Sequence, residues 1–361
     1  MKGQVNARVM FVRVLSLCLI ISVLSGCRSA DTVPESRLID TENKITIGFS
    51  LGTLKEERWV KDRDFFVERA NQLGAQVNVM SANADPGVQM SQAENLILQK
   101  VDILVIVPED AERTAEIVKK AHAAGIKVLS YDRLIKNSEV DLYISFQNEK
   151  VGELQANRLL ETVSKGNFVY VGGAPTDNNA FLFRKGAMGA ISEKVKTGDI
   201  VLVYDNFTTE WRPDIAYQNM KDLLKDNPDI DAIIAANDGT ASGVIKALDE
   251  AGLSGKIPVS GQDAELGACQ RIIKGTQTMT VYKPIKPLAY KAAELAVMLA
   301  KGENPEVNSA VNNGKIDVPS YLLEPVMVDK DNMMDTIVKD GYHPYEEVYL
   351  NVPLDERPIK N

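Results

Sequence analysis

The sequence has few of the residues that build disulfides or transition-metal sites. Only three of its 361 residues are cysteine and two are histidine. Cys18 lies in an apolar N-terminal run and Cys27 stands just after it, so Cys269 alone belongs to the remainder of the chain. His122 and His343 are far apart, and no HExxH or CxxC spacing occurs. We therefore expect neither an intrachain disulfide nor a metal site.

Several functional motifs and an excess of positive charge are also missing. The sequence contains no G-x-x-x-x-G-K phosphate loop, no G-x-G-x-x-G fingerprint, no G-x-S-x-G elbow and no D-x-[DN]-x-[DN]-G calcium loop. Its net charge is -9 and its pI is about 5.0, which disfavours binding to phosphate backbones. We expect no cofactor, no calcium and no nucleic-acid partner.

The first 26 residues have the pattern of a secretion signal. A basic start precedes an apolar run at 14–24 (VLSLCLIISVL), which is too short to span a membrane comfortably. The LSGC stretch that follows resembles the bacterial lipobox, in which cleavage precedes a cysteine that is then lipidated. We expect lipidation at Cys27 and a polar tether over 27–43. The alternatives are an ordinary small-residue cleavage site and an uncleaved anchor.

From Lys44 onward, apolar runs of strand length alternate with amphipathic runs of helix length. ITIGFSL, AQVNVMSA, DILVIVP and KVLSYD are typical of strands, and the runs between them of helices. The alternation restarts at VGELQANRLLETV and continues through NFVYVGG, VLVYD, DAIIAAND and IPVSGQD. This pattern predicts two α/β halves with parallel sheets covered on both faces. The stretch 329–361 is more polar and has few helix signals.

Polar and aromatic side chains follow the ends of these predicted strands. Ligands of open α/β sheets bind beyond the carboxyl ends of the strands, so such side chains are expected to face one site. They are Arg58, Trp59, Asp132, Arg133, Asn178, Asn179, Trp211, Asn237, Asp238, Gln262, Asp263 and Lys283. Each has a structural alternative: a tryptophan can pack in a core, Asn237 can cap a helix, and Lys283 can lie in a solvated turn.

The chemistry of this set suits a carbohydrate. Carboxylates and amides accept the hydroxyl donors of a sugar, while arginine and lysine satisfy its acceptors. Both tryptophans of the chain are in the set, and indole rings can cover the apolar C–H faces of a sugar. Paired carboxylates also serve hydrolases, so a sugar hydrolase remains an alternative.

Long ordered motifs carry a resemblance to a known family. They are LKEERWVKDRDFF, SANADPGVQMSQAEN, YDRLI, YISFQNEKVGELQA, GGAPTDNNAFLFRKGA, AANDGTASG, SGQDAE and GTQTMTVYKPI. From Lys44 to about His343, the chain resembles the periplasmic sugar-binding proteins of the ribose and galactose class. ERWVKDRD and VYKP are similar to the xylose-binding branch rather than the ribose-binding branch, in which two phenylalanines typically stand at the Arg58–Trp59 position.

The resemblance implies an α/β fold of two Rossmann-like lobes with parallel sheets, joined by a hinge of three crossings. We expect these crossings near Gln147, Lys283 and Val318. The first lobe would then hold 44–147 and 284–317, the second 148–283 and 318–345, with a tail at 346–361.

The resemblance also implies a function and a binding site. The family's sugar contacts, carried over onto matching residues, are Arg58, Trp59, Asp132, Arg133, Asn179, Trp211, Asn237, Asp263 and Lys283. The implied function is capture of a monosaccharide and its delivery to the permease subunits of an ABC importer. D-xylose is the expected sugar, with ribose, glucose, galactose and arabinose as alternatives. We expect a monomer without catalytic residues, lipid-anchored on the extracytoplasmic face of the membrane or periplasmic.

Two further functions use a similar cleft. A sugar sensor would present its occupancy to a membrane kinase or chemoreceptor, and gene neighbourhood would separate it from a transporter component. A repressor of the related fold would need an N-terminal DNA-binding helix-turn-helix, where this sequence has a lipoprotein-like signal instead.

Overall fold

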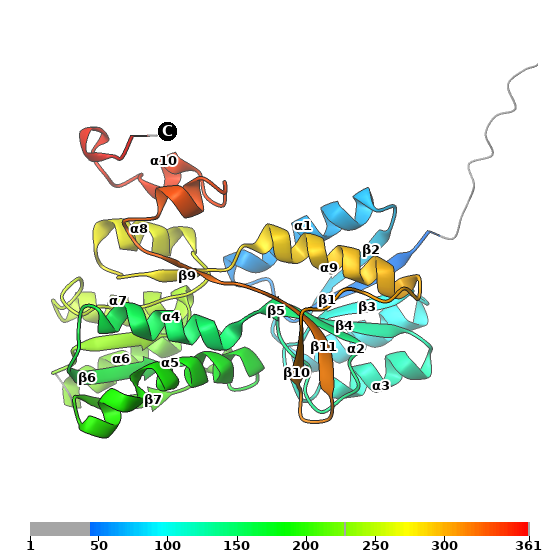
Figure 1. The fold of residues 1–361 in the computed structure, drawn as a ribbon, viewed down its shortest axis with the longest axis horizontal. Coiled ribbons are helices and arrows are strands. Elements are labelled where there is room, and N and C mark those ends of the chain that lie inside the picture. The colour runs from blue at the N-terminus through cyan, green and yellow to red at the C-terminus, as the bar shows by residue number, and fades with distance from the viewer. Residues whose placement is uncertain (1–43, 227–228, 360–361) are drawn as a thin grey trace, which may run out of the picture. The chain divides into compact units, whose positions relative to one another are not determined.

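The computed structural model describes residues 44–226 and 229–359. The expected signal segment (1–26), Cys27 and the tether (27–43) lie outside these residues. The described chain forms two α/β lobes, the first on a seven-stranded sheet and the second on a three-stranded and a two-stranded sheet (Figure 1). The predicted parallel α/β architecture is therefore confirmed. Within this part of the chain, no helix has the length and apolar character needed to cross a membrane.

The sheet of the first lobe is parallel apart from one edge strand. Its order is β10-β11-β5-β4-β3-β1-β2, and only the β10–β11 pair is antiparallel. The strands are β1 (Thr46–Leu51), β2 (Gln76–Ser81), β3 (Ile103–Val107), β4 (Lys127–Tyr131), β5 (Leu142–Phe146), β10 (Ser309–Asn312) and β11 (Asp317–Leu323).

Helices cover both faces of this sheet. They are α1 (Glu57–Gln72), α2 (Pro86–Leu98), α3 (Ala115–Ala123) and α9 (Ile285–Ala300). Ile103 and Val105 of the interior strand β3 pack with α1 and α9, whereas Leu104 and Ile106 pack with α2 and α3. Because both faces are covered, every residue of β3 is buried, which explains the unbroken apolar run ILVIV.

The second lobe repeats this arrangement on a smaller sheet. Parallel strands lie in the order β7-β6-β8, and an antiparallel pair, β12-β9, lies apart. The strands are β6 (Gly166–Val171), β7 (Ile200–Asn206), β8 (Ala232–Ala235), β9 (Thr280–Tyr282) and β12 (Val326–Val328). The helices are α4 (Asn148–Leu160), α5 (Asn178–Thr197), α6 (Pro213–Asp226), α7 (Asp238–Glu250) and α8 (Leu266–Lys274). One face packs against α4 and α5, the other against α6 and α7.

Two glycines let α4 and α5 approach backbone to backbone. A Cβ atom at Gly152 would lie 1.8 Å from the carbonyl oxygen of Phe183, and one at Gly186 would lie 1.8 Å from that of Glu149. Both distances are far below a van der Waals contact, so only glycine fits at either position. The N-termini of these two helices carry Asn148 and Asn178–Asn179 toward the first lobe.

The chain passes between the lobes three times. The first passage lies between β5 and α4 at Gln147 and the second between β9 and α9 at Lys283–Pro284, as expected. The expectation of a third passage near Val318 is wrong. Residues 318–323 belong to β11, which pairs with β5 of the first lobe up to Leu323, so the chain passes between β11 and β12 instead.

Other local expectations also need correction. The strand β5 is not among the expected elements, and IPVSGQD forms only isolated bridges, at Val259 and Gln262, rather than a continuous strand. The polar stretch after β12 folds into short helical segments: η2 (Met334–Val338), α10 (Tyr345–Val348) and η3 (Leu354–Glu356). Val348 and Tyr349, in the expected tail, are buried against α8, so this part of the tail belongs to the second lobe.

Candidate functional site

A cavity between the lobes gathers the side chains that follow the strand ends. Its lining residues are Glu56, Arg58, Trp59, Asp132, Arg133, Asp177, Asn179, Phe183, Trp211, Asn237, Gln262, Asp263 and Lys283. All nine residues predicted to contact sugar are among them. Because parallel strands in both lobes end at this cavity, residues from seven separate stretches of sequence meet there.

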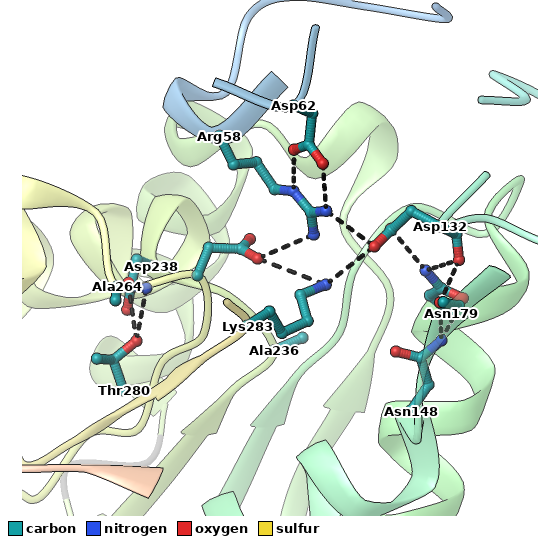
Figure 2. A network of polar contacts seen from close by, with 12 residues as sticks. Arg58, Asp62, Asp132, Asn148, Asn179, Ala236, Asp238, Ala264, Thr280 and Lys283 are labelled. Atoms are coloured by element: carbon teal, nitrogen blue, oxygen red, sulfur yellow. Dashed lines mark hydrogen bonds and ion pairs between the residues drawn. The ribbon is translucent and has the colours of Figure 1, made fainter. Parts of the chain in front are cut away.

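Arg58 and Lys283 hold the carboxylates of the two lobes together (Figure 2). Arg58 lies on α1 and donates from Nη2 to Asp132 at 2.8 Å and from Nη1 to Asp263 at 3.3 Å. Its Nε donates to Asp62 one turn further along α1, at 3.1 Å. Lys283, at the second passage between the lobes, lies 3.7 Å from Asp132 and 3.5 Å from Asp263.

Burial sets the electrostatics of this group. Arg58, Asp132 and Lys283 are each at most 3% exposed. Burial alone would raise the pKa of Asp132, but the nearby charges of Arg58 and Lys283 outweigh it, and the pKa of this carboxyl is lowered. Burial raises the pKa of Asp62, which also accepts a short hydrogen bond from Tyr131. The cavity therefore presents the ionised carboxylate of Asp132.

Asn179 is oriented by a chain of hydrogen bonds that runs across the lobes. Asn148 donates from Nδ2 to the side-chain oxygen of Asn179 at 2.9 Å. The amide nitrogen of Asn179 is thereby turned to donate to the backbone oxygen of Asp132 at 3.1 Å and to its carboxylate at 3.2 Å. Tyr143 and Ser145 donate to the same backbone oxygen, at 2.9 and 2.6 Å. Asp132 itself has a φ of 59°, a left-handed conformation that these donors stabilise.

Asp177 forms a second connection between the lobes. One of its carboxylate oxygens accepts from the backbone nitrogen of Asn179 at 2.9 Å and so caps α5. The other oxygen lies 2.9 Å from Nε of Arg133 and accepts from the indole nitrogen of Trp211 at 3.2 Å. Asp177 thus fixes the positions of a guanidinium group from one lobe and an indole ring from the other.

The two tryptophans are fixed by different contacts. The guanidinium groups of Arg58 and Arg133 lie 4.4 and 5.2 Å from the ring centre of Trp59. Trp211 lies directly against the backbone at Gly173, where a Cβ atom would be 1.9 Å from the indole ring. Only glycine at 173 allows the ring to occupy this place.

Two residues of the set had purely structural alternatives, a helix cap for Asn237 and a solvated turn for Lys283, and the structure decides them differently. Asn237 does cap a helix: its side-chain oxygen accepts from the backbone nitrogen of Thr240 at 2.8 Å, at the start of α7. It also lines the cavity, so its role as a cap does not exclude a contact with ligand. Lys283 is only 2% exposed and faces two carboxylates, which excludes a solvated turn.

Sequence reasoning missed some lining residues and included others that do not line the cavity. Glu56, Asp177 and Phe183 were not recognised, although Asp177 stands directly before the Asn178–Asn179 pair. Gln262, which follows a predicted strand, lines the cavity although it is not among the nine expected sugar contacts. Asn178 lines a separate surface hollow, and Asp238 is buried behind the cavity, where it accepts from Gln277 and Thr280.

The lining offers both hydrogen-bond acceptors and hydrogen-bond donors. Carboxylates and amide oxygens accept hydrogen bonds, while guanidinium, ammonium and amide nitrogens donate them, and indole rings supply apolar faces. Among the described residues that line the cavity, none is Ser, Thr, Cys, His or Tyr. This arrangement suits a small polyhydroxylated molecule.

Comparison with known proteins places this site in a family. The model of the periplasmic binding protein domain matches residues 47–304. The D-xylose-binding periplasmic proteins of Haemophilus influenzae and Escherichia coli are each 50% identical to this chain over 84% of its length, covering 92% and 93% of their own. A solved ABC transporter solute-binding protein from Clostridium phytofermentans, with bound β-D-glucose, has a TM-score of 0.79 at 29% identity, covering 84% of this chain and 99% of its own. The chain belongs to the periplasmic binding protein family.

Proposed function

We propose that this protein captures D-xylose between its lobes outside the cytoplasm and delivers it to an ABC importer. The observation that carries the proposal is the cavity itself, where paired charges and both tryptophans converge from the two lobes. The choice of D-xylose rests on the two D-xylose-binding relatives at 50% identity. Ribose, glucose, galactose and arabinose are the alternatives.

Binding would proceed by closure of the lobes about the three passages. The sugar binds first to the groups of one lobe, and closure then brings those of the other lobe into contact. Asp132, Asp177 and Asp263 accept from sugar hydroxyls, while Arg58 and Lys283 donate to its oxygens. A buried polar group left unpaired costs about 1–3 kcal/mol, so the cavity discriminates against sugars that lack one hydroxyl. The sugar leaves chemically unchanged, and the protein acts as a receptor rather than an enzyme.

Attachment to the membrane through Cys27 is a further part of the proposal. It rests on the LSGC stretch after the apolar run at 14–24. One acyl chain binds membranes only marginally, so stable retention would require more than one chain. Labelled fatty acid should be incorporated into the wild type and not into a Cys27→Ser variant. Equal labelling of the two would exclude this anchor.

Uptake of labelled D-xylose by cells that lack the gene tests delivery. We expect the deletion strain to lose uptake of D-xylose. The wild-type gene should restore uptake, whereas the Asp263→Asn variant, which removes a carboxylate from the cavity, should not. Asp214→Asn is the matched control, because Asp214 is exposed and pairs only locally with Arg212. Normal uptake in the deletion strain, with loss of a response to xylose, would favour a sensor that reports sugar occupancy to a kinase or chemoreceptor.

A further inference from the structure

The segment after β12 packs on the second lobe beside the cavity. Met333 and Ile337 of this C-terminal segment (329–359) lie in one apolar cluster with Cys269 and Ile272 of α8 and Tyr282 of β9. Figure 1 shows its short helices next to α8, beyond the two main sheets. Its attachment to the second lobe places Tyr342 and His343 at a defined position.

Tyr342 and His343 hold the turn that carries Asp263. Asp263 and Ala264 have φ values of 96° and 51°, so this turn has a conformation that side chains rarely adopt. Tyr342 donates its hydroxyl to the backbone oxygen of Asp263 at 3.3 Å, and Nε2 of His343 lies 2.7 Å from the backbone oxygen of Ala264. A carbonyl oxygen only accepts, so Nε2 carries the proton and Nδ1 of the neutral ring is left as an acceptor.

The same two residues contact α1 of the first lobe. Lys61 donates from Nζ to the backbone oxygen of Tyr342 at 2.9 Å and lies 3.8 Å from the centre of its ring. The Lys61 ammonium is also 3.4 Å from Nδ1 of His343, the atom left free to accept. Glu57, one turn earlier on α1, accepts from the backbone nitrogen of Leu266 at the start of α8.

These contacts surround Arg58 on the side that faces away from the cavity. Arg58 lies between Glu57 and Lys61 on α1, and its ion-pair partner Asp263 lies on the turn held by Tyr342 and His343. A contact of Lys61 with the C-terminal segment joins the two lobes, so it forms only when they are closed. Lys61 itself is not among the residues that line the cavity.

We propose that Tyr342 and His343 are positioning residues of the sugar site, which with Lys61 form a latch outside the cavity that slows release of the sugar. The proposal rests on the proposed sugar-binding function. A contact made only in the closed state adds to the barrier for opening and leaves the open state unchanged, so it affects dissociation rather than association.

Stopped-flow tryptophan fluorescence with D-xylose tests the latch. We expect Lys61→Met to raise the dissociation rate about three- to tenfold, in the range of one partly exposed charged hydrogen bond, with association unchanged. Arg63→Met is the matched control, because it removes one cation from the same helix, where Arg63 pairs only with Asp64. Thermal unfolding of the sugar-free Lys61→Met variant should match that of the wild type, a result that a merely structural role would not produce.

The outcomes separate the latch from the proposed function. If wild type and Arg63→Met bind xylose and Lys61→Met releases it at the wild-type rate, the latch is excluded. Equal acceleration by both variants would also exclude it, because the effect would then be one of net charge. If His343→Gln accelerates release and adds nothing in the Lys61→Met background, the two residues act as one unit, as proposed. Absence of xylose binding by the wild type would instead contradict the proposed function.

Discussion

Arg58 is the residue on which the buried charge of the cavity most depends. It contacts Asp62, Asp132 and Asp263, and its side chain is only 3% exposed. Removal of one partner from a buried ion pair leaves an uncompensated charge, at a cost of about 3–5 kcal/mol. We expect Arg58→Met to lower the free energy of unfolding by that amount in urea denaturation.

A second arginine on the same helix provides the control for this measurement. Arg69 pairs with Glu294, but its side chain is 30% exposed. Surface pairs contribute about 1 kcal/mol or less, so Arg69→Met should have a small effect. Equal losses in the two variants would contradict the view that burial gives the Arg58 network its importance.

Glu109 makes stability depend on pH. It lies 3.6 Å from Arg133, and burial raises its pKa to about 7 despite that cation. Between its unfolded pKa, about 4.3, and pH 7, the folded protein keeps a proton that the unfolded chain has lost. Stability is therefore greatest below this range and falls as the pH rises through it. Glu109→Gln should reduce the slope of the curve between pH 5 and 7, and an unchanged slope would contradict this assignment.

Cavity residues could be predicted from the sequence where they directly follow a strand, because the end of the strand then fixes their place in the sheet. In each lobe the carboxyl ends of the parallel strands lie at one edge of the sheet, so Asp132 of the first lobe and Asn237 of the second could each be assigned to a binding edge without a structure. Asp177 could not be recognised because its sequence context, directly before a helix, is that of a cap, and it does cap α5. Its second oxygen binds Arg133 across the lobes, a contact that depends on tertiary structure alone.

At the scale of elements, the pairing of α4 with α5 positions the amides of the cavity. The contact at Gly152 brings the helices together so that Asn148 reaches Asn179. Gly152→Ala would force them apart, and overpacking of this kind costs about 1–3 kcal/mol. We expect that loss in chemical denaturation, together with weaker sugar binding. Gly189→Ala, at an open position inside α5, should be neutral or stabilising; a similar loss there would contradict the argument.

The placement of β11 shows why lobe boundaries were harder to predict than strands. The expected third passage near Val318 was placed on the family resemblance, but a strand belongs to the sheet that pairs with it. Leu323 pairs with Phe146 of β5, and its backbone oxygen accepts from Gln147 at 2.9 Å, so β11 lies beside the first passage. Such pairing joins residues nearly 180 positions apart and leaves no local signal in the sequence.

At the scale of the whole described molecule, contacts in and around the cavity join the lobes besides the chain passages. The ion pairs of Arg58 and Lys283 cross the cavity, and Lys61 contacts the C-terminal segment on one side of it. Elsewhere, Ala111 of the first lobe donates its backbone nitrogen to Thr176 of the second at 2.9 Å. A sugar bound in the cavity is thus enclosed by contacts that must break before it leaves.

Calorimetric titration of residues 28–361 with D-xylose, beside ribose, glucose and arabinose, tests the central claim most directly. We predict one-to-one binding of D-xylose that is tighter than that of the other sugars and is lost in Trp211→Ala, which removes an indole wall of the cavity. Tighter binding of another sugar would retain the site and change its ligand. No binding of any of these sugars would contradict the account.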